Sequence, residues 1–424
     1  MRAASRLVTS PARRGLGRAV HALRRRARGG RPVVGYFHQV DDPYSHLAVQ
    51  VLQPLAHRYG VELKVWLVPP PDDAAAPERE RLRTYGLRDA ARLARAYGLA
   101  FPQGAPDAEA VALCGRVLAR AQGSGRFSEI AQAAGAALWS GDGAALTALA
   151  AEEGAASSGE LAASLEAGAA ERLRFGHYLG GMFYFEGEWF WGVDRLGLLE
   201  KRLAGFDTAP AGTPTLAPLR DMALEAFLPS QTPLVIELWF SFRSPYSWLV
   251  LPRIRRLARH YGAALELRFI LPMVMRGLPV PPVKRRYIML DCKREAERLG
   301  LPFGRIVDPV GAGVERAIAV LHHAIPLGLG EEVAELGLRA AFADGIALAE
   351  DPGLYDVARR AGLTDAQTTA ALLDDGWRTP AEANRQALFD AGLWGAPSFR
   401  VNGLPAHWGQ DRLWALDEDM QTLM

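Results

Sequence analysis

VIELWFSFRSPYSWLVLPRIRRLARHYGAALELRFI, residues 235–270, contains the pattern that decides the fold. Its opening run of β-branched, aromatic and aliphatic residues predicts a strand. Ser244 and Pro245 then have the residue types of a helix N-cap and first turn, and Gly262 suits the helix end. The segment ALELRFIL alternates apolar and polar residues, as a second strand does. We therefore predict a βαβ unit with parallel strands.

The same pattern occurs earlier in the chain, in VVGYFHQVDDPYSHLAVQVLQPLAHRYGVELKVWLV at residues 33–68. Tyr246 lies 202 residues after Tyr44, and the same spacing relates Asp291 to Asp89. Near the ends, HWGQDRL at 407–413 lies 217 residues after FWGVDRL at 190–196. A self-similarity of this kind indicates one domain of roughly 190 residues present twice.

The rest of each copy completes the predicted domain. Residues 284–385 are rich in Ala, Leu, Arg and Glu and predict helices. APSFRVNGLPAHWGQDRLWAL then predicts a strand, a turn at Asn402-Gly403, a short strand and a helix that begins near Gln410-Asp411. This order is typical of an α/β protein with two tandem thioredoxin-like domains, each with a helical insertion. The predicted divisions are 1–30, a basic extension; 31–205, the first domain; 206–232, a linker around one short helix; and 233–424, the second domain.

Composition favours a folded protein of the cytoplasm. The chain has 424 residues, of which 49% are hydrophobic and 23% charged, as in globular proteins. Its 2 cysteines, Cys114 and Cys292, are far apart, so no disulfide framework or zinc-site spacing is present. That suits a reducing compartment. No apolar run reaches the roughly 18 residues of a membrane helix. We expect a cytoplasmic protein without a metal site.

The first forty residues are strongly basic, with ten arginines before the first acidic residue, Asp41. A transit peptide and a basic surface helix that touches anionic lipid or nucleic acid are both compatible with this pattern. No apolar core follows the charges, which argues against a secretory signal. The prediction that we favour is a disordered tail, with no stable membrane anchor and no nucleic-acid partner.

Three motifs of the second copy resemble a known family. They are FRSPYSWL (242–249), KRRYIMLDCKREAERLGLPF (284–303), and WGAPSFRVNG with HWGQDRL (394–413). The second copy resembles the DsbA-like thioredoxin fold, and within it the 2-hydroxychromene-2-carboxylate isomerases and the kappa-class glutathione transferases. The resemblance covers residues 230–424 and, more weakly, 31–205.

The resemblance implies a glutathione site. Ser244 stands at the N-cap, where the disulfide oxidoreductases of this fold have their attacking cysteine; a serine hydroxyl can instead donate a hydrogen bond to the glutathione thiolate. Pro397 matches a cis-proline that frees the backbone of Ala396 for a peptide-like ligand. The implied glutathione-binding residues are Ser244, Pro245, Tyr246, Lys284, Ala396, Pro397, Gln410 and Asp411, with Ser244 as the catalytic residue.

Each of these residues also has a structural interpretation. Ser244 can be a plain N-cap, worth about 1 kcal/mol. Pro397 can be an ordinary trans proline, Gln410 and Asp411 can simply cap a helix, and Lys284 can lie at a solvated helix start.

The activity implied by the resemblance is isomerisation of an unsaturated aromatic 2-oxo acid. A thiolate adds to the substrate, the double bond becomes single and rotates, and it re-forms as the thiolate leaves. The alternatives are a kappa-like glutathione transferase acting on another small aromatic electrophile and a non-catalytic thioredoxin-fold binding protein. Disulfide exchange is disfavoured because neither copy contains C-x-x-C.

Several positions depart from the family pattern or admit two interpretations. Met275 stands near the place of a family asparagine, for which Arg276 could compensate. Cys292 is expected to pack as a small apolar residue. Tyr246, Trp394 and Trp408 could line an aromatic pocket or belong to the core.

The first copy lacks two central residues of the predicted site. Asp42 stands where the second copy has Ser244, and Gly180 where it has Pro397. An aspartate is a good N-cap, but its charge repels a thiolate. We expect a degenerate copy that is retained for structure and forms an internal pseudo-dimer with the second.

Overall fold

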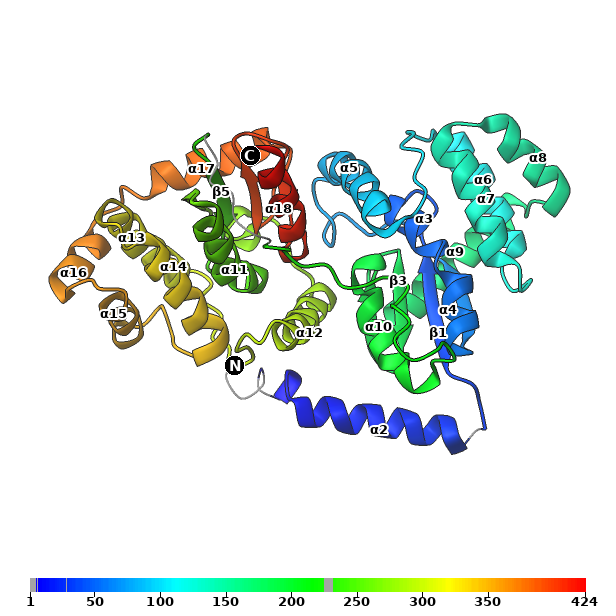
Figure 1. Cartoon of the computed structure of the whole chain (residues 1–424), viewed down its shortest axis with the longest axis horizontal. Coiled ribbons are helices and arrows are strands. Elements are labelled where there is room, and N and C mark those ends of the chain that lie inside the picture. The colour runs from blue at the N-terminus through cyan, green and yellow to red at the C-terminus, as the bar shows by residue number, and fades with distance from the viewer. Residues whose placement is uncertain (1–4, 6, 28, 225–231) are drawn as a thin grey trace. The chain divides into compact units, whose positions relative to one another are not determined.

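The structure, a computed structural model, describes residues 5, 7–27, 29–224 and 232–424. The chain forms two compact units (Figure 1). The N-terminal unit is Gly15–Leu219, and the C-terminal unit is Arg220–Met424 together with Met1–Arg14.

The C-terminal unit is built on a four-stranded sheet in the order β6-β5-β7-β8. Its strands are β5 (Val235–Phe240), β6 (Ala264–Phe269), β7 (Ser398–Val401) and β8 (His407–Trp408). β5 is parallel to β6 and antiparallel to β7, which is antiparallel to β8. Helix α11 (Pro245–Tyr261) connects the two parallel strands, which confirms the predicted βαβ unit. The 3-10 turn η6 (Gln410–Arg412) and helix α18 (Leu413–Thr422) close the unit.

A helical insertion lies between β6 and β7, as predicted, and contains no strand among these fully described residues. In Figure 1 its helices α13 to α16 lie on the opposite side of β5 from α18. The helical elements of the whole insertion are η3 (Met273–Arg276), α12 (Pro282–Arg298), α13 (Ala312–Ala324), η4 (Ile325–Leu327), α14 (Gly330–Arg339), η5 (Ala340–Asp344), α15 (Asp351–Arg360), α16 (Asp365–Leu373) and α17 (Arg378–Asp390).

The N-terminal unit has a sheet of the same topology, in the order β2-β1-β3-β4. The strands are β1 (Val33–His38), β2 (Glu62–Leu67), β3 (Met182–Phe185) and β4 (Glu188–Trp191), with the same parallel and antiparallel pairings. Its helices are α3 (Pro43–Val49), α4 (Leu52–Tyr59), α5 (Arg79–Tyr97), α6 (Ala108–Ala121), α7 (Phe127–Ser140), α8 (Gly143–Glu153), α9 (Ser158–Arg174) and α10 (Leu196–Leu203), with 3-10 turns η1 (Val193–Arg195) and η2 (Ala204–Phe206).

Equivalent tyrosines make equivalent hydrogen bonds in the two units. The hydroxyl of Tyr44 donates to Asp89 over 2.9 Å, and that of Tyr246 donates to Asp291 over 2.8 Å. Each bond ties the first turn of the helix after the first strand to the middle of a helix in the insertion.

A second pair of hydrogen bonds follows both sequence offsets. The hydroxyl of Tyr59 donates to Glu200 over 3.0 Å, and that of Tyr261 donates to Asp417 over 2.7 Å. The tyrosines are 202 residues apart and the acids 217. The two spacings found in the sequence therefore connect residues with the same place in each unit.

The strand registers correct one predicted correspondence. Phe183 pairs with β1 as Phe399 pairs with β5, so β3 precedes β7 by 216 residues rather than 217. The residue of the N-terminal unit at the place of Pro397 is therefore Gly181, not Gly180. The one-residue difference arises within the hairpin, because the connection from β7 to β8 is one residue longer than that from β3 to β4.

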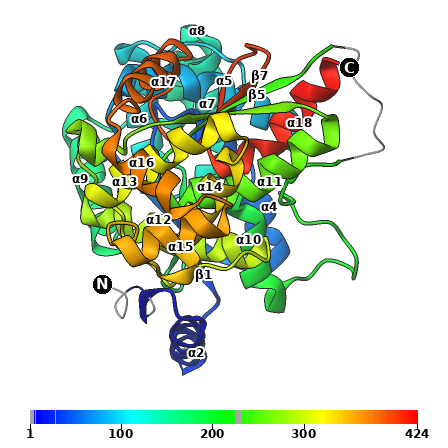
Figure 2. The same cartoon turned by 90° about the vertical axis from the view of Figure 1, so that its left-hand side faces the viewer.

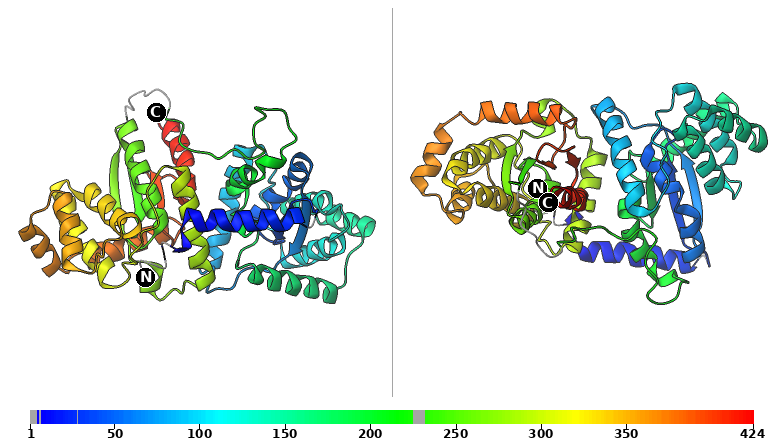
Figure 3. Two further views of the ribbon diagram at one scale, coloured as in Figure 1. Left: turned by 90° about the horizontal axis from the view of Figure 1, so that it is seen from below. Right: turned by 45° about the horizontal axis from the view of Figure 1, so that its top comes forward.

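Helix α2 (Pro11–Ala27) replaces the disordered tail that we favoured for the basic extension. Figure 2 shows it almost end-on, and the left view of Figure 3 shows its length. In the predicted linker, residues 207–224 form no helix, so the short helix expected there is absent from that part; residues 225–231 lie outside the described ranges. No helix among the described residues is long and apolar enough to cross a membrane.

Candidate functional site

Ser244 is the N-cap of α11, as predicted, with φ −92° and ψ 112°. Its hydroxyl oxygen accepts a hydrogen bond from the backbone N–H of Ser247 over 3.2 Å. The hydroxyl proton is donated to the carbonyl of Ala396 over 2.9 Å. Ser244 therefore links the start of the helix to the loop before β7, and its proton already has an acceptor within the protein.

The second serine of the motif has a structural role. The hydroxyl oxygen of Ser247 accepts from the backbone N–H of Ser241 over 3.4 Å. In the N-terminal unit, Ser45 accepts from the backbone N–H of Gln39 over 3.2 Å. Both bonds close the connection between the first strand and the following helix. The spacing Ser-Pro-x-Ser thus combines one residue that faces the loop before β7 with one that stabilises the turn.

The loop before β7 approaches Ser244 closely. Its Ala396–Pro397 peptide bond is cis, as predicted. A Cβ atom at Gly395 would lie 2.6 Å from the indole nitrogen of Trp408, so only glycine fits there. The rings of Trp394 and Trp408 are 4.7 Å apart, and Trp394 is 2% exposed. Trp394 therefore belongs to the core, and the half-buried Trp408 covers the loop.

Arg276 reaches the same loop from η3. Its guanidinium donates to the carbonyl of Trp394 over 2.9 Å. This contact places a cationic side chain near the loop that contains Ala396 and Pro397.

Lys284 lies in the first turn of α12, after Pro282 at the helix start. Burial lowers the pKa of its ammonium group from 10.5 to about 8. Residues seven apart share a helix face, so Lys284 is on the side of α12 that carries Asp291, the acceptor of the Tyr246 hydroxyl. A half-buried amine of this pKa can hold a carboxylate as a cation at neutral pH and lose its charge in mildly alkaline solution.

Gln410 faces the interior of the C-terminal unit. It is 1% exposed, its side-chain amide donates to Glu295 over 2.8 Å, and its amide oxygen accepts from Arg253 over 2.9 Å. Its side chain is thus engaged in the fold. The N-cap of η6 is Gly409, one residue before the predicted helix start. Asp411 is half-buried, and one carboxylate oxygen lies 3.5 Å from the guanidinium of Arg412.

Arg243 is a neighbour of the site that the sequence did not single out. Two of its guanidinium nitrogens donate to the carboxylate of Asp308, each over 2.8 Å. The bidentate pair holds the residue before Ser244 against the segment that precedes α13. The only signal for Arg243 in the sequence was its position directly before Ser244, because no sequence pattern indicates Asp308 as its partner.

Neither cysteine has the environment of a reactive thiolate. Cys114 and Cys292 are buried thiols, and both lie in the interior of helices. Burial raises the pKa of the Cys114 thiol to about 12. Cys292 is packed in the core, as predicted. The described residues also contain no cluster of three or more His, Cys, Asp or Glu side chains that could hold a metal ion.

The N-terminal unit has a carboxyl group in place of the Ser244 hydroxyl. Asp42 caps α3 and accepts from the backbone N–H of Ser45 over 2.9 Å and from the Ser45 hydroxyl over 2.7 Å. Burial raises the pKa of this carboxyl to about 6. A Cβ atom at Gly181 would lie 3.1 Å from Asp42, so the loop before β3 also faces the helix start. This arrangement offers acceptors rather than a free donor.

Comparison with known proteins agrees with this fold. Residues 235–421 match the family described as "DSBA-like thioredoxin domain", so the chain contains a DsbA-like thioredoxin domain in its C-terminal unit. No curated protein matches the chain.

Three solved structures illustrate the structural likeness. A 2-hydroxychromene-2-carboxylate isomerase is 22% identical, with a TM-score of 0.38 over 45% of this chain and 95% of that one. A putative protein disulfide isomerase from Nitrosomonas europaea is 20% identical, with a TM-score of 0.36 over 45% and 99%. The cytosolic disulfide reductase DsbM from Pseudomonas aeruginosa is 19% identical, with a TM-score of 0.35 over 44% and 95%. Likeness at this level carries no argument about function.

Proposed function

We propose that the C-terminal unit is a glutathione-dependent isomerase of the 2-hydroxychromene-2-carboxylate isomerase type. The observation that carries the proposal is the position of the Ser244 hydroxyl, which caps α11 and lies 2.9 Å from the carbonyl of Ala396. A hydroxyl donor therefore stands at a helix N-terminus, where the dipole favours an anion. The chain has no thiol there, and glutathione, when bound, would supply one.

The residues around Ser244 suit an anionic, peptide-like ligand. Lys284 offers a half-buried ammonium group that is charged below pH about 8 and can hold a carboxylate. The backbone of Ala396 lies beside Ser244 and suits the peptide part of glutathione. Asp411 offers a carboxylate for the α-amine. Gln410 would contribute only backbone groups, because its side chain is bonded to Glu295 and Arg253.

In the proposed reaction, Ser244 favours the thiolate form of glutathione by donating a hydrogen bond from its hydroxyl to the sulfur. That requires rotation of the hydroxyl away from the Ala396 carbonyl, which exchanges a neutral acceptor for a charged one. Hydrogen bonds to charged groups are about twice as strong as neutral ones, so the exchange is favourable. Lys284 and Arg276 are the cations that could hold the carboxylate of a 2-oxo acid substrate.

A non-catalytic binding protein is a second candidate function. Two observations favour it: the Ser244 hydroxyl already has an acceptor, and the Gln410 side chain is engaged in the core. Glutathione should stabilise either protein against heat if it binds the native state. Only an enzyme should have a glutathione-dependent reaction rate, and that rate should fall when Ser244 is changed.

The test is Ser244→Ala, measured as glutathione-dependent isomerisation of an unsaturated aromatic 2-oxo acid. Loss of one hydrogen bond to a developing anion typically lowers a rate by about 10²–10³. The loss of the cap should cost about 1 kcal/mol in the free energy of unfolding.

The matched control is Asp42→Ala, which removes the equivalent cap and should leave the rate within a few-fold. Full activity of Ser244→Ala would reduce Ser244 to a cap. Loss of activity in Asp42→Ala would assign the reaction to the N-terminal unit instead.

A further inference from the structure

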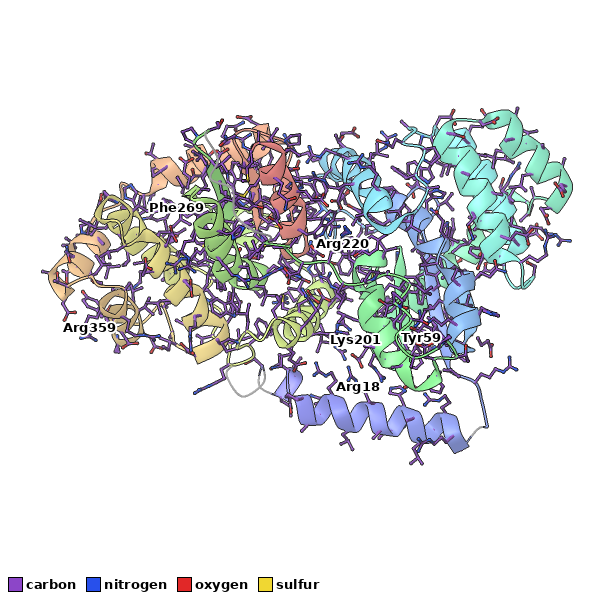
Figure 4. All side chains as sticks on the ribbon, viewed as in Figure 1. Arg18, Tyr59, Lys201, Arg220, Phe269 and Arg359 are labelled. Atoms are coloured by element: carbon purple, nitrogen blue, oxygen red, sulfur yellow. The ribbon has the colours of Figure 1, made fainter. Side chains whose placement is uncertain are left out.

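One side of α2 is held by the hairpin between β3 and β4. The guanidinium of Arg18 donates to both carboxylate oxygens of Glu188, over 2.6 and 2.9 Å. About two turns further along, Arg25 forms an ion pair with Glu186, and its guanidinium lies 4.8 Å from the ring centre of Phe206. Figure 4 labels Arg18 on the side of the helix that faces the rest of this unit. The hairpin acids, which also pair with Arg202, therefore engage the arginines of this inner side.

The opposite side of α2 presents an exposed apolar stripe. Leu16, Val20 and Leu23 are 67%, 37% and 68% exposed. The spacing of four and three residues places them on one face. At about 100° per residue, Arg24 and Arg26 lie roughly 80° to either side of Leu16, and both are exposed. No acidic residue occurs in α2. The outer face is thus a stripe of apolar side chains between two arginines.

We propose that this outer face of α2 docks reversibly on an anionic lipid surface. The leucines and Val20 would enter the boundary between headgroups and acyl chains, and the flanking arginines would bind lipid phosphates. Charge complementarity selects this occupant, because Arg18 and Arg25 are already paired with Glu188 and Glu186. Arg24 and Arg26 are exposed on the outer side and remain available to phosphates. A nucleic acid would match the arginines but would leave the leucines in water. The inference is independent of the proposed function.

Binding of the full chain to vesicles tests the proposal. The vesicles contain phosphatidylcholine with phosphatidylserine, or phosphatidylcholine alone, and bound protein is measured by co-sedimentation. We expect binding only to the anionic vesicles, and binding that weakens as salt is raised. Arg24→Glu with Arg26→Glu should lower the affinity at least about tenfold, since each basic residue near such a surface contributes about 1 kcal/mol. Leu16→Asp with Leu23→Asp should abolish binding.

Matched controls exist elsewhere in the chain. Leu173 is 68% exposed on α9 of the same unit, so Leu173→Asp repeats the change made at Leu23 outside the stripe. Arg256 and Arg259 are exposed on α11, so reversing both repeats the charge change on another helix. These variants should bind vesicles like the unaltered chain. Circular dichroism of every variant verifies the fold.

Three outcomes would overturn the proposal. The first is equal binding to neutral and anionic vesicles, or loss of binding in the controls. The second is retention by duplex DNA, lost with the arginines but not with the leucines, together with no vesicle binding. The third is a dimer in sedimentation that Leu16→Asp with Leu23→Asp dissociates, again without vesicle binding; a second copy of the chain would then cover the stripe.

Discussion

Lys284 is proposed to bind a carboxylate, and the burial of its charge should lower the free energy of unfolding at neutral pH. Its pKa is lowered to about 8 by burial, whereas an unfolded lysine has its ordinary value near 10.5. Between these two values the unfolded chain binds the extra proton, so stability rises with pH across that window. Below pH about 8 the amine is charged in both the folded and the unfolded state, so burial of the charge lowers the free energy of unfolding by its full amount.

Lys284→Met should therefore stabilise the C-terminal unit at pH 7, by about 1–3 kcal/mol. The gain should disappear near pH 10.5, where both states of the lysine are neutral. Urea unfolding at the two pH values measures the difference. The same variant should weaken stabilisation by glutathione at pH 7. A gain that is equal at both pH values would show that size, not charge, is responsible.

Asp42 gives the opposite pH dependence in the N-terminal unit. Burial raises its pKa to about 6, above the ordinary value of 3.8 for an aspartate. The folded state therefore binds the extra proton between pH 4 and 6, and the stability due to this group falls as pH rises through that range.

Asp42→Asn keeps a good N-cap without the buried charge. It should stabilise the N-terminal unit at pH 7 by about 1–2 kcal/mol, and the gain should vanish near pH 4. Asp107→Asn is the control, because Asp107 caps α6 through one backbone N–H but is exposed. Thermal melts of both variants at pH 4 and 7 measure the effect; identical behaviour of the two would contradict a cost due to burial at Asp42.

At the scale of elements, a half-buried tyrosine ties the site helix to the insertion. Tyr246 in the first turn of α11 donates to Asp291 in α12, which also accepts from Arg294 over 3.0 Å. Tyr246→Phe should cost about 1.5–3 kcal/mol, the usual value for a hydrogen bond to a charged group. Because α12 also contains Lys284, this variant should lower glutathione-dependent activity.

Tyr44→Phe is the matched change in the N-terminal unit. It removes the equivalent bond to Asp89, which retains the hydroxyl of Tyr85 at 3.2 Å. The free energy of unfolding should fall by an amount similar to that for Tyr246→Phe, while the activity stays unchanged. Equal loss of activity in both variants would show that the site depends on stability rather than on α12.

The elements that could be predicted from the sequence are those defined by neighbours along the chain. β5, α11 and the turn at Asn402-Gly403 follow from alternation, capping residues and a left-handed Asn-Gly pair, with φ of 45° and 73°. The orientation of Gln410 could not be predicted, because it depends on Arg253 and Glu295, which are distant in sequence.

The same limit explains the two corrections to the predicted fold. Helix α2 is held by ion pairs to Glu186 and Glu188, more than 150 residues away, so its own sequence resembled a free basic tail. The place of Gly181 depends on strand register, which the gapless motif comparison could not give. Sequence patterns thus predicted the start of the site helix, and long-range packing decided which side chains stay accessible around it.

At the scale of the whole molecule, two units share a sheet topology but only one has a hydroxyl at the helix start. Leu47 and Leu249 occupy equivalent positions 202 residues apart, and both are fully buried. A leucine-to-alanine change in such a core costs about 2–5 kcal/mol. If each unit folds around its own core, each change should destabilise one unit.

Leu249→Ala should therefore speed hydrogen exchange in Arg220–Met424 and remove much of the protection that glutathione gives at elevated temperature. Leu47→Ala should speed exchange in Gly15–Leu219 and leave the glutathione-dependent protection in place. Hydrogen exchange followed by mass spectrometry assigns the change to peptides of each unit. If both variants instead speed exchange equally throughout the chain, the units unfold together. If glutathione protects peptides of the N-terminal unit in the Leu249→Ala protein, that unit binds it as well, and the carboxyl of Asp42 does not exclude the ligand.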